Sequence, residues 1–275
     1  MENVIGIDIG GTKTLIGLSM GKDQVTTRQF QTVFGDFETF LVSLRENIAK
    51  ALEEGNYEFS DFKSIGISCP GLLEIDKGVI VAAINLGWKK IELVKAIQNI
   101  TGVEEVILEG DTRCGLIAEF HARGGRYQSM TYLTASTGIG CAMMFDGKIF
   151  RGAHNFAGEV GQSLTRDGMR LEEIASGRFL LDFGSTPENV LSAGNALGEC
   201  IYNLFQIIDT EVCVIGGGLG LNNHEYFHAV QKFLSTCEQR SPSGRKYPVE
   251  KSIYGTQAPL MGSLLVAHQK WQIKL

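Results

Sequence analysis

The chain has 275 residues, of which 44% are hydrophobic and 20% are charged, and its formal net charge is −6. This composition is typical of a folded globular protein and excludes a largely disordered chain. The acidic balance argues against nucleic acid as a partner, because binding a phosphate backbone requires a basic face. No apolar run approaches the ~20 residues that span a bilayer, so we expect a cytoplasmic protein without a membrane partner.

The first half of the chain alternates between strand and helix patterns. Apolar residues predict strands over 4–8 and 14–19 around a glycine-rich turn, with Gly21-Lys22 at the tip of the next hairpin. A helix is predicted to begin after Asp36, a good N-cap residue, and to stop at Gly55. Further strands are expected over 65–68, 78–82 and 103–108, and helices over 93–100 and 111–123.

A second cycle begins at residue 130. Strands are predicted over 130–135 and 139–145 around another Ser/Thr-Gly turn, followed by the tip Asp146-Gly147-Lys148. A long helix over 191–208, a strand over 212–215 and a closing helix over 258–271 complete the chain. Both cycles consist of strand, glycine turn, strand and Gly-Lys hairpin, which indicates an internal duplication with both turns facing one central cleft. The alternative is a chance likeness between two β-hairpins.

The first glycine turn follows the first strand and contains Asp8, Gly10, Gly11, Thr12 and Lys13. Paired glycines allow a phosphate to approach the backbone, Thr12 adds a hydroxyl donor, and Asp8 can hold Mg²⁺ through water. The spacing matches neither a P-loop nor a dinucleotide-binding fingerprint. Taken alone, it would indicate an ordinary glycine hairpin.

Two more glycine turns occur in the second half. Thr137, Gly138 and Gly140 repeat the pattern of glycine and hydroxyl residues, and the run Gly216, Gly217 and Gly218 follows an apolar strand. The glycine run is suited to line the floor of an adenosine site. Three glycine turns, each following a strand, favour a nucleotide-binding protein more strongly than any one of them.

In order and content these motifs resemble the ROK family of bacterial sugar kinases and sugar-responsive repressors. The resemblance runs over essentially the whole chain and includes residues 8–13, 69–71, 85–88, 109–111, 133–140, 152–161, 171–177 and 216–218. It implies an α/β, actin-like (RNase H-like) duplicated ATPase fold with two domains around a central cleft. We expect a smaller domain over 1–110, joined by the C-terminal helix 258–275, and a larger domain over 111–257.

The resemblance also implies a catalytic residue. Asp111 stands where the family has its general base, and a carboxylate within hydrogen-bond reach of a sugar hydroxyl suits that role. The alternative role of Asp111 is that of a helix N-cap. Repressor members carry a DNA-binding segment ahead of the first phosphate turn, for which residues 1–7 leave no room. The kinase branch is therefore expected, with ATP and Mg²⁺ as cofactors and a homodimer as the assembly.

Sugar-binding positions follow from the same resemblance. Glu159 and Glu172 match the family's sugar-binding carboxylates, which accept hydrogen bonds from vicinal hydroxyls. Gly71 and Asn85 fall at positions that line the sugar pocket in similar proteins. The substrate-binding set that we predict is Gly71, Asn85, Gly110, Asp111, Glu159, Gln162 and Glu172.

This chain departs from the family at three places. Gln162 replaces a histidine, and the cysteines of the family's zinc-binding loop are absent from the short stretch 163–170. The six cysteines are scattered and are expected to be buried free thiols, so no zinc site is predicted. Gly110 replaces an asparagine that reads sugar hydroxyls, which indicates altered sugar selectivity.

The working hypothesis is a kinase that phosphorylates the 6-hydroxyl of a hexose, an N-acylhexosamine such as N-acetylmannosamine, or a β-glucoside. Two alternatives stay open: a non-catalytic sugar-sensing regulator of the same family, and an actin-like ATPase. The retained Asp111 argues against the regulator, and the paired Glu159 and Glu172 argue against the ATPase.

Overall fold

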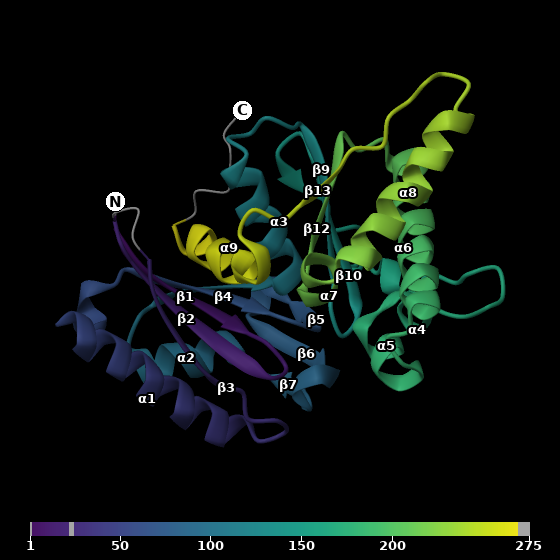
Figure 1. Ribbon diagram of the computed structural model, residues 1–275. Coiled ribbons are helices and arrows are strands. Elements are labelled where there is room, and N and C mark those ends of the chain that lie inside the picture. Colours follow the sequence, from purple (N-terminus) through teal and green to yellow (C-terminus); the bar gives the residue numbers. More distant parts are fainter. Residues whose placement is uncertain (1, 22–24, 269–275) are drawn as a thin grey trace. The chain divides into compact units, whose positions relative to one another are not determined.

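The computed structural model describes residues 2–21 and 25–268 (Figure 1). Lys22 of the expected hairpin tip and residues 269–271 of the expected closing helix lie outside these ranges. The chain forms two compact units, Met1–Ala118 with Pro259–Leu275 and Glu119–Ala258. The chain passes from the first unit to the second inside helix α3 (Asp111–Ala122), eight residues beyond the expected boundary at 110.

The first unit is built on a five-stranded sheet with the order β3-β2-β1-β4-β8. Its strands are β1 (Asn3–Ile9), β2 (Lys13–Met20), β3 (Val25–Gln31), β4 (Ser64–Cys69) and β8 (Glu105–Gly110). The strands β1, β2 and β3 pair antiparallel, whereas β1, β4 and β8 pair parallel. The strand expected over 103–108 is β8, which begins and ends two residues later than predicted.

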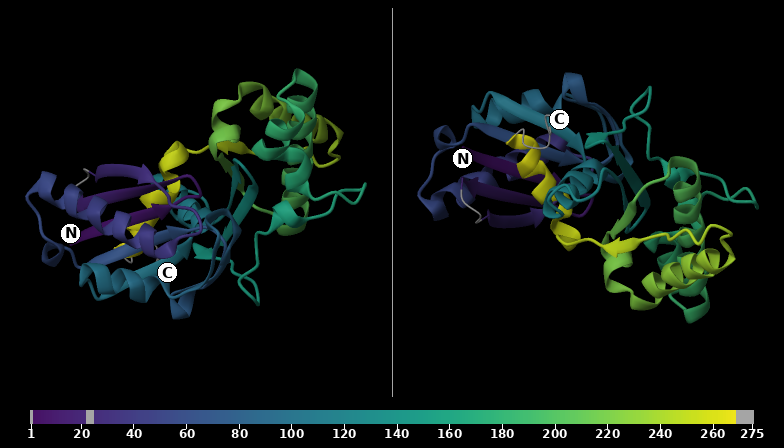
Figure 2. Two further views of the ribbon diagram at one scale, coloured as in Figure 1. Left: turned by 90° about the horizontal axis from the view of Figure 1, so that it is seen from below. Right: turned by 90° about the horizontal axis from the view of Figure 1, so that it is seen from above.

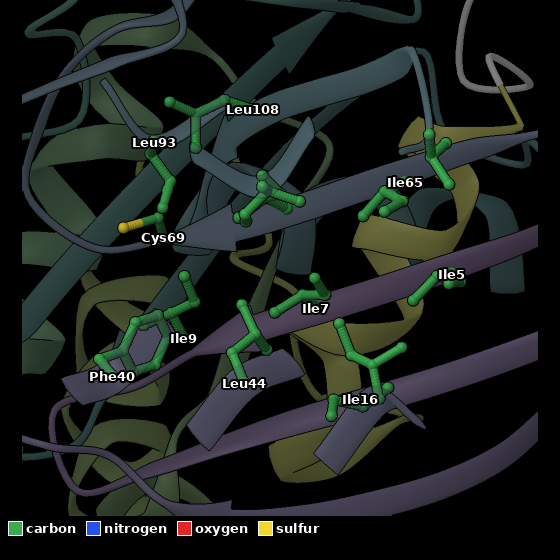
Figure 3. Close-up of a cluster of buried hydrophobic side chains, with 14 of the residues drawn as sticks. Ile5, Ile7, Ile9, Ile16, Phe40, Leu44, Ile65, Cys69, Leu93 and Leu108 are labelled. Atoms are coloured by element: carbon green, nitrogen blue, oxygen red, sulfur yellow. The ribbon is translucent and has the colours of Figure 1, made fainter. Parts of the chain in front are cut away.

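Helices cover both faces of this sheet. Helices α1 (Phe37–Gly55) and α2 (Leu93–Thr101) lie on one face, and α9 (Ala258–Ala267) lies on the other (Figures 1 and 2). Ile5, Ile7 and Ile9 of β1 point into the core beside α1, as Figure 3 shows. Val4 packs instead against Leu264 of α9. Apolar residues on both faces explain why β1 reads as an almost continuous hydrophobic run.

A small antiparallel sheet completes the first unit. It contains β5 (Leu72–Glu74), β6 (Val79–Ala83) and β7 (Trp88–Ile91), in that order. The strand expected over 78–82 is β6, and its neighbours β5 and β7 were not predicted. These three strands carry the loops that contain Gly71 and Asn85, two of the predicted sugar-pocket positions.

The sheet of the second unit repeats the arrangement of the first. Its order is β11-β10-β9-β12-β13, formed by β9 (Ser129–Ala135), β10 (Ile139–Phe145), β11 (Lys148–Ile149), β12 (Val212–Gly216) and β13 (Val249–Lys251). Again the first three strands of the unit pair antiparallel, and the remaining two pair in parallel. The identical strand order confirms the internal duplication that the two sequence cycles predicted.

Two long helices, α6 (Pro187–Ile208) and α8 (His224–Arg240), pack side by side in the second unit (Figure 1). Their backbones approach closely because α6 presents Gly194 and Gly198 to α8, where a Cβ would lie within 3.0 Å of Ala229 and Phe233. Helix α8 was not predicted, although its apolar residues recur at helical spacing. The shorter helices are α4 (Leu171–Ala175), α5 (Gly177–Phe183) and α7 (Gly218–Asn222).

Single 3₁₀ turns occur at Phe59–Asp61, Ile75–Lys77, Ile84–Leu86, Val160–Gln162 and Gly255–Gln257. All six cysteines are free thiols, as predicted, although Cys200 and Cys237 are only partly buried. Across the described part of the chain, no helix is both long and apolar enough to cross a membrane.

A buried carboxylate organises the segment that leads from β13 to α9. Glu119 of α3, which is fully buried, pairs with Arg123, the first residue after the end of that helix. It also accepts hydrogen bonds from the backbone N–H groups of Ile253 and Tyr254, at 3.0 and 3.1 Å. Arg123 reaches Glu250 of β13 at 2.9 Å. This network joins α3 to residues that lie about 130 positions further along the chain.

Candidate functional site

The carboxyl ends of three parallel strands meet at one edge of the first sheet. Asp8 of β1 pairs in register with Ser68 of β4, and Cys69 of β4 pairs with Gly110 of β8. The Ser68 hydroxyl donates to Asp8 Oδ1 at 2.7 Å. Asp111 follows Gly110 directly, so the sheet register brings Asp8 and Asp111 to the same edge. Ligands commonly bind at this edge of parallel sheets.

Both carboxyl groups have raised pKa values. The pKa of Asp8 is raised to about 7, chiefly by burial and also by the nearby charge of Asp111, although the Ser68 hydrogen bond and Lys13 oppose the shift. Burial also raises the pKa of Asp111, against the hydrogen bonds from Thr112 and the charge of Arg113. Neighbouring carboxylates whose burial disfavours their charged forms are typical of a site that receives a cation or a proton.

Asp111 is the first residue of α3 and takes part in its N-terminal turn. Its Oδ1 accepts from the backbone N–H of Thr112 at 2.7 Å and from the Thr112 hydroxyl at 3.1 Å. Within the described chain, these hydrogen bonds to another residue use Oδ1 only. The capping role that competed with catalysis therefore occupies one carboxylate oxygen and leaves Oδ2 for a ligand.

The turn between β1 and β2 presents exposed polar groups beside Asp8. Gly10 N donates to the Lys13 carbonyl at 3.0 Å, which closes the turn, and Gly11, Thr12 and Lys13 are exposed. The backbone of Asn85 approaches this turn so closely that a Cβ on Gly11 would lie 3.0 Å from its carbonyl oxygen. The first predicted phosphate turn and one predicted sugar residue are thus neighbours.

The backbone and the packing require a glycine at position 71 but not at position 110. Gly71 has a φ of 103°, and its Cβ would lie 2.5 Å from the Ala82 carbonyl, so the fold requires glycine there. Gly110 has no such constraint. Its nearest side chain is that of Arg113, whose Nη1 lies 3.5 Å from the buried carboxylate of Glu109.

In the second unit, the turn after β9 is held by the start of α5. The backbone N–H groups of Gly177 and Arg178 donate to the carbonyls of Ser136 and Thr137, at 2.7 and 3.2 Å. Ser136 N donates in turn to the Gly138 carbonyl at 3.0 Å. The turn is therefore rigid on its inner side, and Thr137 and Gly138 stay partly or fully exposed.

The two predicted glycine motifs of this unit are adjacent in the sheet. Thr134 of β9 pairs with Gly140 of β10 on one side and with Gly216 of β12 on the other. Gly217 has a φ of 81° and packs against the Ala135 backbone, whereas a Cβ on Gly218 would meet no atom within 4 Å. The arrangement provides an open backbone surface beside the Thr137 turn.

The predicted sugar-binding side chains of the second unit gather at the same turn. Gln162 Nε2 donates to Glu172 Oε1 at 2.6 Å. The other oxygen of Glu172 lies 3.1 Å from the position that a Cβ on Gly138 would occupy. Glu159 is exposed at the start of the 3₁₀ turn that contains Gln162. The structure thus brings Gln162 and Glu172 together beside the Thr137 turn.

Sequence reasoning missed two residues of the first unit. Ser68 holds Asp8, and Arg113 lies beside Asp111 and Gly110. Arg113 had a detectable signal, because a residue two positions after a catalytic aspartate at a helix start stays close to it. Ser68 had none, since its place depends on which strand pairs with β1.

The carboxylate pair also bears on metal binding. No group of three or more His, Cys, Asp and Glu side chains in the described residues could hold a metal ion. Mg²⁺ usually needs only one or two carboxylates, because it retains several waters and takes oxygens from substrate phosphates. Asp8 and Asp111 fit that chemistry, since burial raises both pKa values by disfavouring the charged carboxylates and a divalent cation would offset that effect.

The duplicated five-stranded sheets, each with glycine turns at its strand ends, define an actin-like ATPase fold. The chain belongs to the ROK family, whose sequence pattern, described as "ROK family", matches residues 4–178. A solved structure, the ROK hexokinase of Thermus thermophilus, aligns with a TM-score of 0.78 and 28% identity over 98% of each chain.

Two relatives of this chain differ in kind, since one is named a kinase and the other a repressor. A glucokinase of Halalkalibacterium halodurans is 27% identical over 267 residues, covering 78% of this chain and 80% of that protein. A xylose repressor of Caldicellulosiruptor bescii is 29% identical over 164 residues, covering 58% of this chain. This chain spans only 41% of the length of that repressor. The family assignment therefore leaves open whether the protein is an enzyme or a regulator.

Proposed function

We propose that this protein is an ATP-dependent sugar kinase that transfers the γ-phosphate of ATP to the 6-hydroxyl of a hexose, an N-acylhexosamine or a β-glucoside. The observation that carries the proposal is Asp111. It stands at the end of a parallel strand, beside a second carboxylate, with one oxygen outside its own helix cap. A repressor that only binds sugar does not need a general base.

The residues divide the reaction between them. Asp111 accepts the proton of the attacking hydroxyl, which aligns the nucleophile and typically contributes about 10²–10⁴-fold to the rate. The turns containing Gly10–Lys13 and Thr137–Gly140 donate backbone N–H groups to phosphate oxygens. Mg²⁺, held through Asp8, would supply charge neutralisation at the transferring phosphate. Glu159 and Glu172 accept hydrogen bonds from sugar hydroxyls, and the Gln162 amide can both accept and donate them.

Phosphate transfer depends mostly on positioning and charge stabilisation, and these features suit it. The hydrogen bonds from Gly177 and Arg178 fix the Thr137 turn before any ligand arrives. Likewise, the Ser68 hydrogen bond fixes one oxygen of Asp8. A site that is organised in advance loses less entropy when it binds.

The second candidate is a sugar-sensing regulator, which the likeness to the xylose repressor favours. A coupled ADP-release assay over hexoses, N-acylhexosamines and β-glucosides separates the two. We expect one class of sugar to raise ADP release well above the rate without sugar. If no sugar in the panel does so, while calorimetry detects sugar binding, the regulator is correct and the kinase proposal is wrong.

A further inference from the structure

Residues 163–170 form a short β-hairpin in the second unit. Its two arms meet at an antiparallel bridge between Leu164 and Arg170. One step nearer the base of the hairpin, Leu171 N donates to the Ser163 carbonyl at 2.9 Å. Both contacts belong to one register, because each joins residues that lie equally far from the tip.

The same register, continued by one position, sets Gln162 opposite Glu172. Residues directly opposite each other in an antiparallel pair have Cβ atoms about 4.5–5.5 Å apart, so their side chains interact. Gln162 Nε2 donates to Glu172 Oε1 at 2.6 Å. A shift of one residue on either arm would change which residues stand opposite each other. The register of the hairpin therefore determines whether these two side chains meet.

The register is set at the tip of the hairpin. Thr165 N donates to the Met169 carbonyl at 2.8 Å, and Gly168 N donates back to the Thr165 carbonyl at 3.0 Å. Gly168 has a φ of 79°. A turn that ends in a left-handed residue is the common form of a three-residue hairpin loop, and glycine adopts this conformation without strain. A Cβ on Gly168 would meet no atom within 4 Å, so the backbone conformation alone favours glycine here.

The base of the hairpin is tied to the residues that flank it. Ser163 Oγ donates to the Val160 carbonyl at 2.6 Å. On the other arm, Arg170 N donates to Glu173 Oε2 at 2.8 Å. Glu173 lies in the first turn of α4, as Glu172 does. The hairpin is therefore continuous with the helical turn that carries the Glu172 carboxylate.

We propose that the hairpin 163–170 is a positioning element of the proposed sugar site, which raises the affinity for the sugar by holding Gln162 against Glu172. This inference rests on the proposed function. The hydrogen bond from Gln162 fixes Oε1 of Glu172, while Oε2 lies beside the Thr137 turn. A glutamate side chain loses considerable rotamer freedom when it is fixed, so a side chain that is already held loses less on binding. Gly168 is thus a positioning residue that acts through this pair.

Gly168→Ala tests the inference, because alanine strains a backbone with positive φ and adds no clash here. Calorimetry with glucose, N-acetylmannosamine and a β-glucoside first selects the sugar that the wild-type protein binds most tightly. For that sugar we expect Kd, and KM in the ADP-release assay, to rise about 5-fold or more. The values of kcat and of KM for ATP should change less than about 2-fold.

Two further variants of the hairpin check the direction of the effect. Gly168→Asn should bring Kd for the sugar back to within about 2-fold of wild type, since asparagine adopts the left-handed conformation more readily than alanine. Thr165→Val removes the hydrogen bond from the Thr165 hydroxyl to the Met169 carbonyl, at 3.1 Å, and should weaken sugar binding as Gly168→Ala does. This variant also serves if Gly168→Ala does not fold.

Gly244→Ala is the matched control. Gly244 lies in the second unit outside the hairpin and, like Gly168, is exposed. Its φ is 66°, its N–H donates to the Ser241 carbonyl at 3.1 Å, and a Cβ on it would meet no atom within 4 Å. The two substitutions therefore impose the same kind of backbone strain. We expect Gly244→Ala to leave Kd and KM for the sugar within about 2-fold of wild type.

A double variant shows whether the hairpin acts through the side-chain pair. In a Gln162→Ala background, Gly168→Ala should raise KM for the sugar less than about 2-fold, because the contact that the hairpin sets is already lost. An equal effect in both backgrounds, or an effect no larger than that of Gly244→Ala, overturns the proposal and leaves the kinase function standing. If no sugar raises ADP release, the kinase function fails, and the calorimetric Kd values still decide on the hairpin. If no sugar binds either, both proposals are wrong.

Discussion

The buried carboxylate of Glu119 offers the sharpest test of how the second unit is stabilised. The substitution Glu119→Ala removes the partner of Arg123, whose side chain is only 6% exposed, and the acceptor for the N–H groups of Ile253 and Tyr254. Glu250 remains as a partner for Arg123, at 2.9 Å. In the variant, Arg123 therefore keeps only one of its two carboxylate partners, and the N–H groups of Ile253 and Tyr254 lose their acceptor.

The expected loss follows from these contacts. Removing one partner of a buried ion pair costs about 3–5 kcal/mol, because the remaining charge stays desolvated. The retained Glu250 contact argues for the lower half of that range, and the two orphaned N–H groups argue for the upper half. We expect a loss of about 4 kcal/mol, a large fraction of the ~5–15 kcal/mol that stabilises a typical domain.

Urea unfolding, followed by circular dichroism, measures the effect as a shift in midpoint at constant slope. The control is Glu92→Ala, which removes the exposed ion pair with Lys95, whose side chains are 68% and 69% exposed. Such surface pairs contribute about 0–1 kcal/mol. If Glu119→Ala loses no more stability than Glu92→Ala, burial does not determine the strength of this network, and the reasoning is refuted.

The remaining predictions concern activity. Asp111→Asn should lower kcat at least about 10²-fold while the melting temperature stays equal or rises, since the substitution removes a partly buried charge; a kcat within a few-fold of wild type would exclude Asp111 as the base. Gly177→Ala should raise KM for ATP, because its Cβ would lie 2.7 Å from the Ser136 carbonyl and displace α5 from the Thr137 turn; an unchanged KM would mean that this turn does not bind phosphate. Gln162→Ala should raise KM for the sugar about 10-fold, as expected for losing one hydrogen bond to a carboxylate, and equal KM values would contradict the role of the Glu172 contact. Removal of Mg²⁺ by a chelator should abolish ADP release, and re-addition of Mg²⁺ should restore it; activity that persists in the chelator would refute the metal role of Asp8.

Much of the fold was readable from local patterns. Val4, Ile5 and Ile7 predicted the first strand, Asp36 marked the start of α1, and the tip Asp146-Gly147-Lys148 marked the end of β10. The repeat of strand, glycine turn and strand predicted the duplication. These features are local, because hydrophobic period, cap residues and turn residues act within a few positions of the chain.

Helix α8 was not predicted, although its local sequence pattern was sufficient to predict it. Tyr226, Phe227, Val230 and Leu234 recur at helical spacing behind the cap residue Asn223, and all four are buried at no more than 9% exposure. The small sheet of β5, β6 and β7 is different. Strand β6 was predicted, but its neighbours β5 and β7 span only three and four residues, too short for a periodic pattern to be recognised.

The sequence by itself determined the strand ends that carry Asp8, Asp111 and the glycine turns. The tertiary structure decided their partners: Ser68 reaches Asp8 because β4 pairs with β1, and Glu119 meets Ile253 across about 130 residues. The physical reason is that strand order and register result from burying the whole core at once. No short segment contains that information, so long-range pairs of polar groups appear only when the chain is folded.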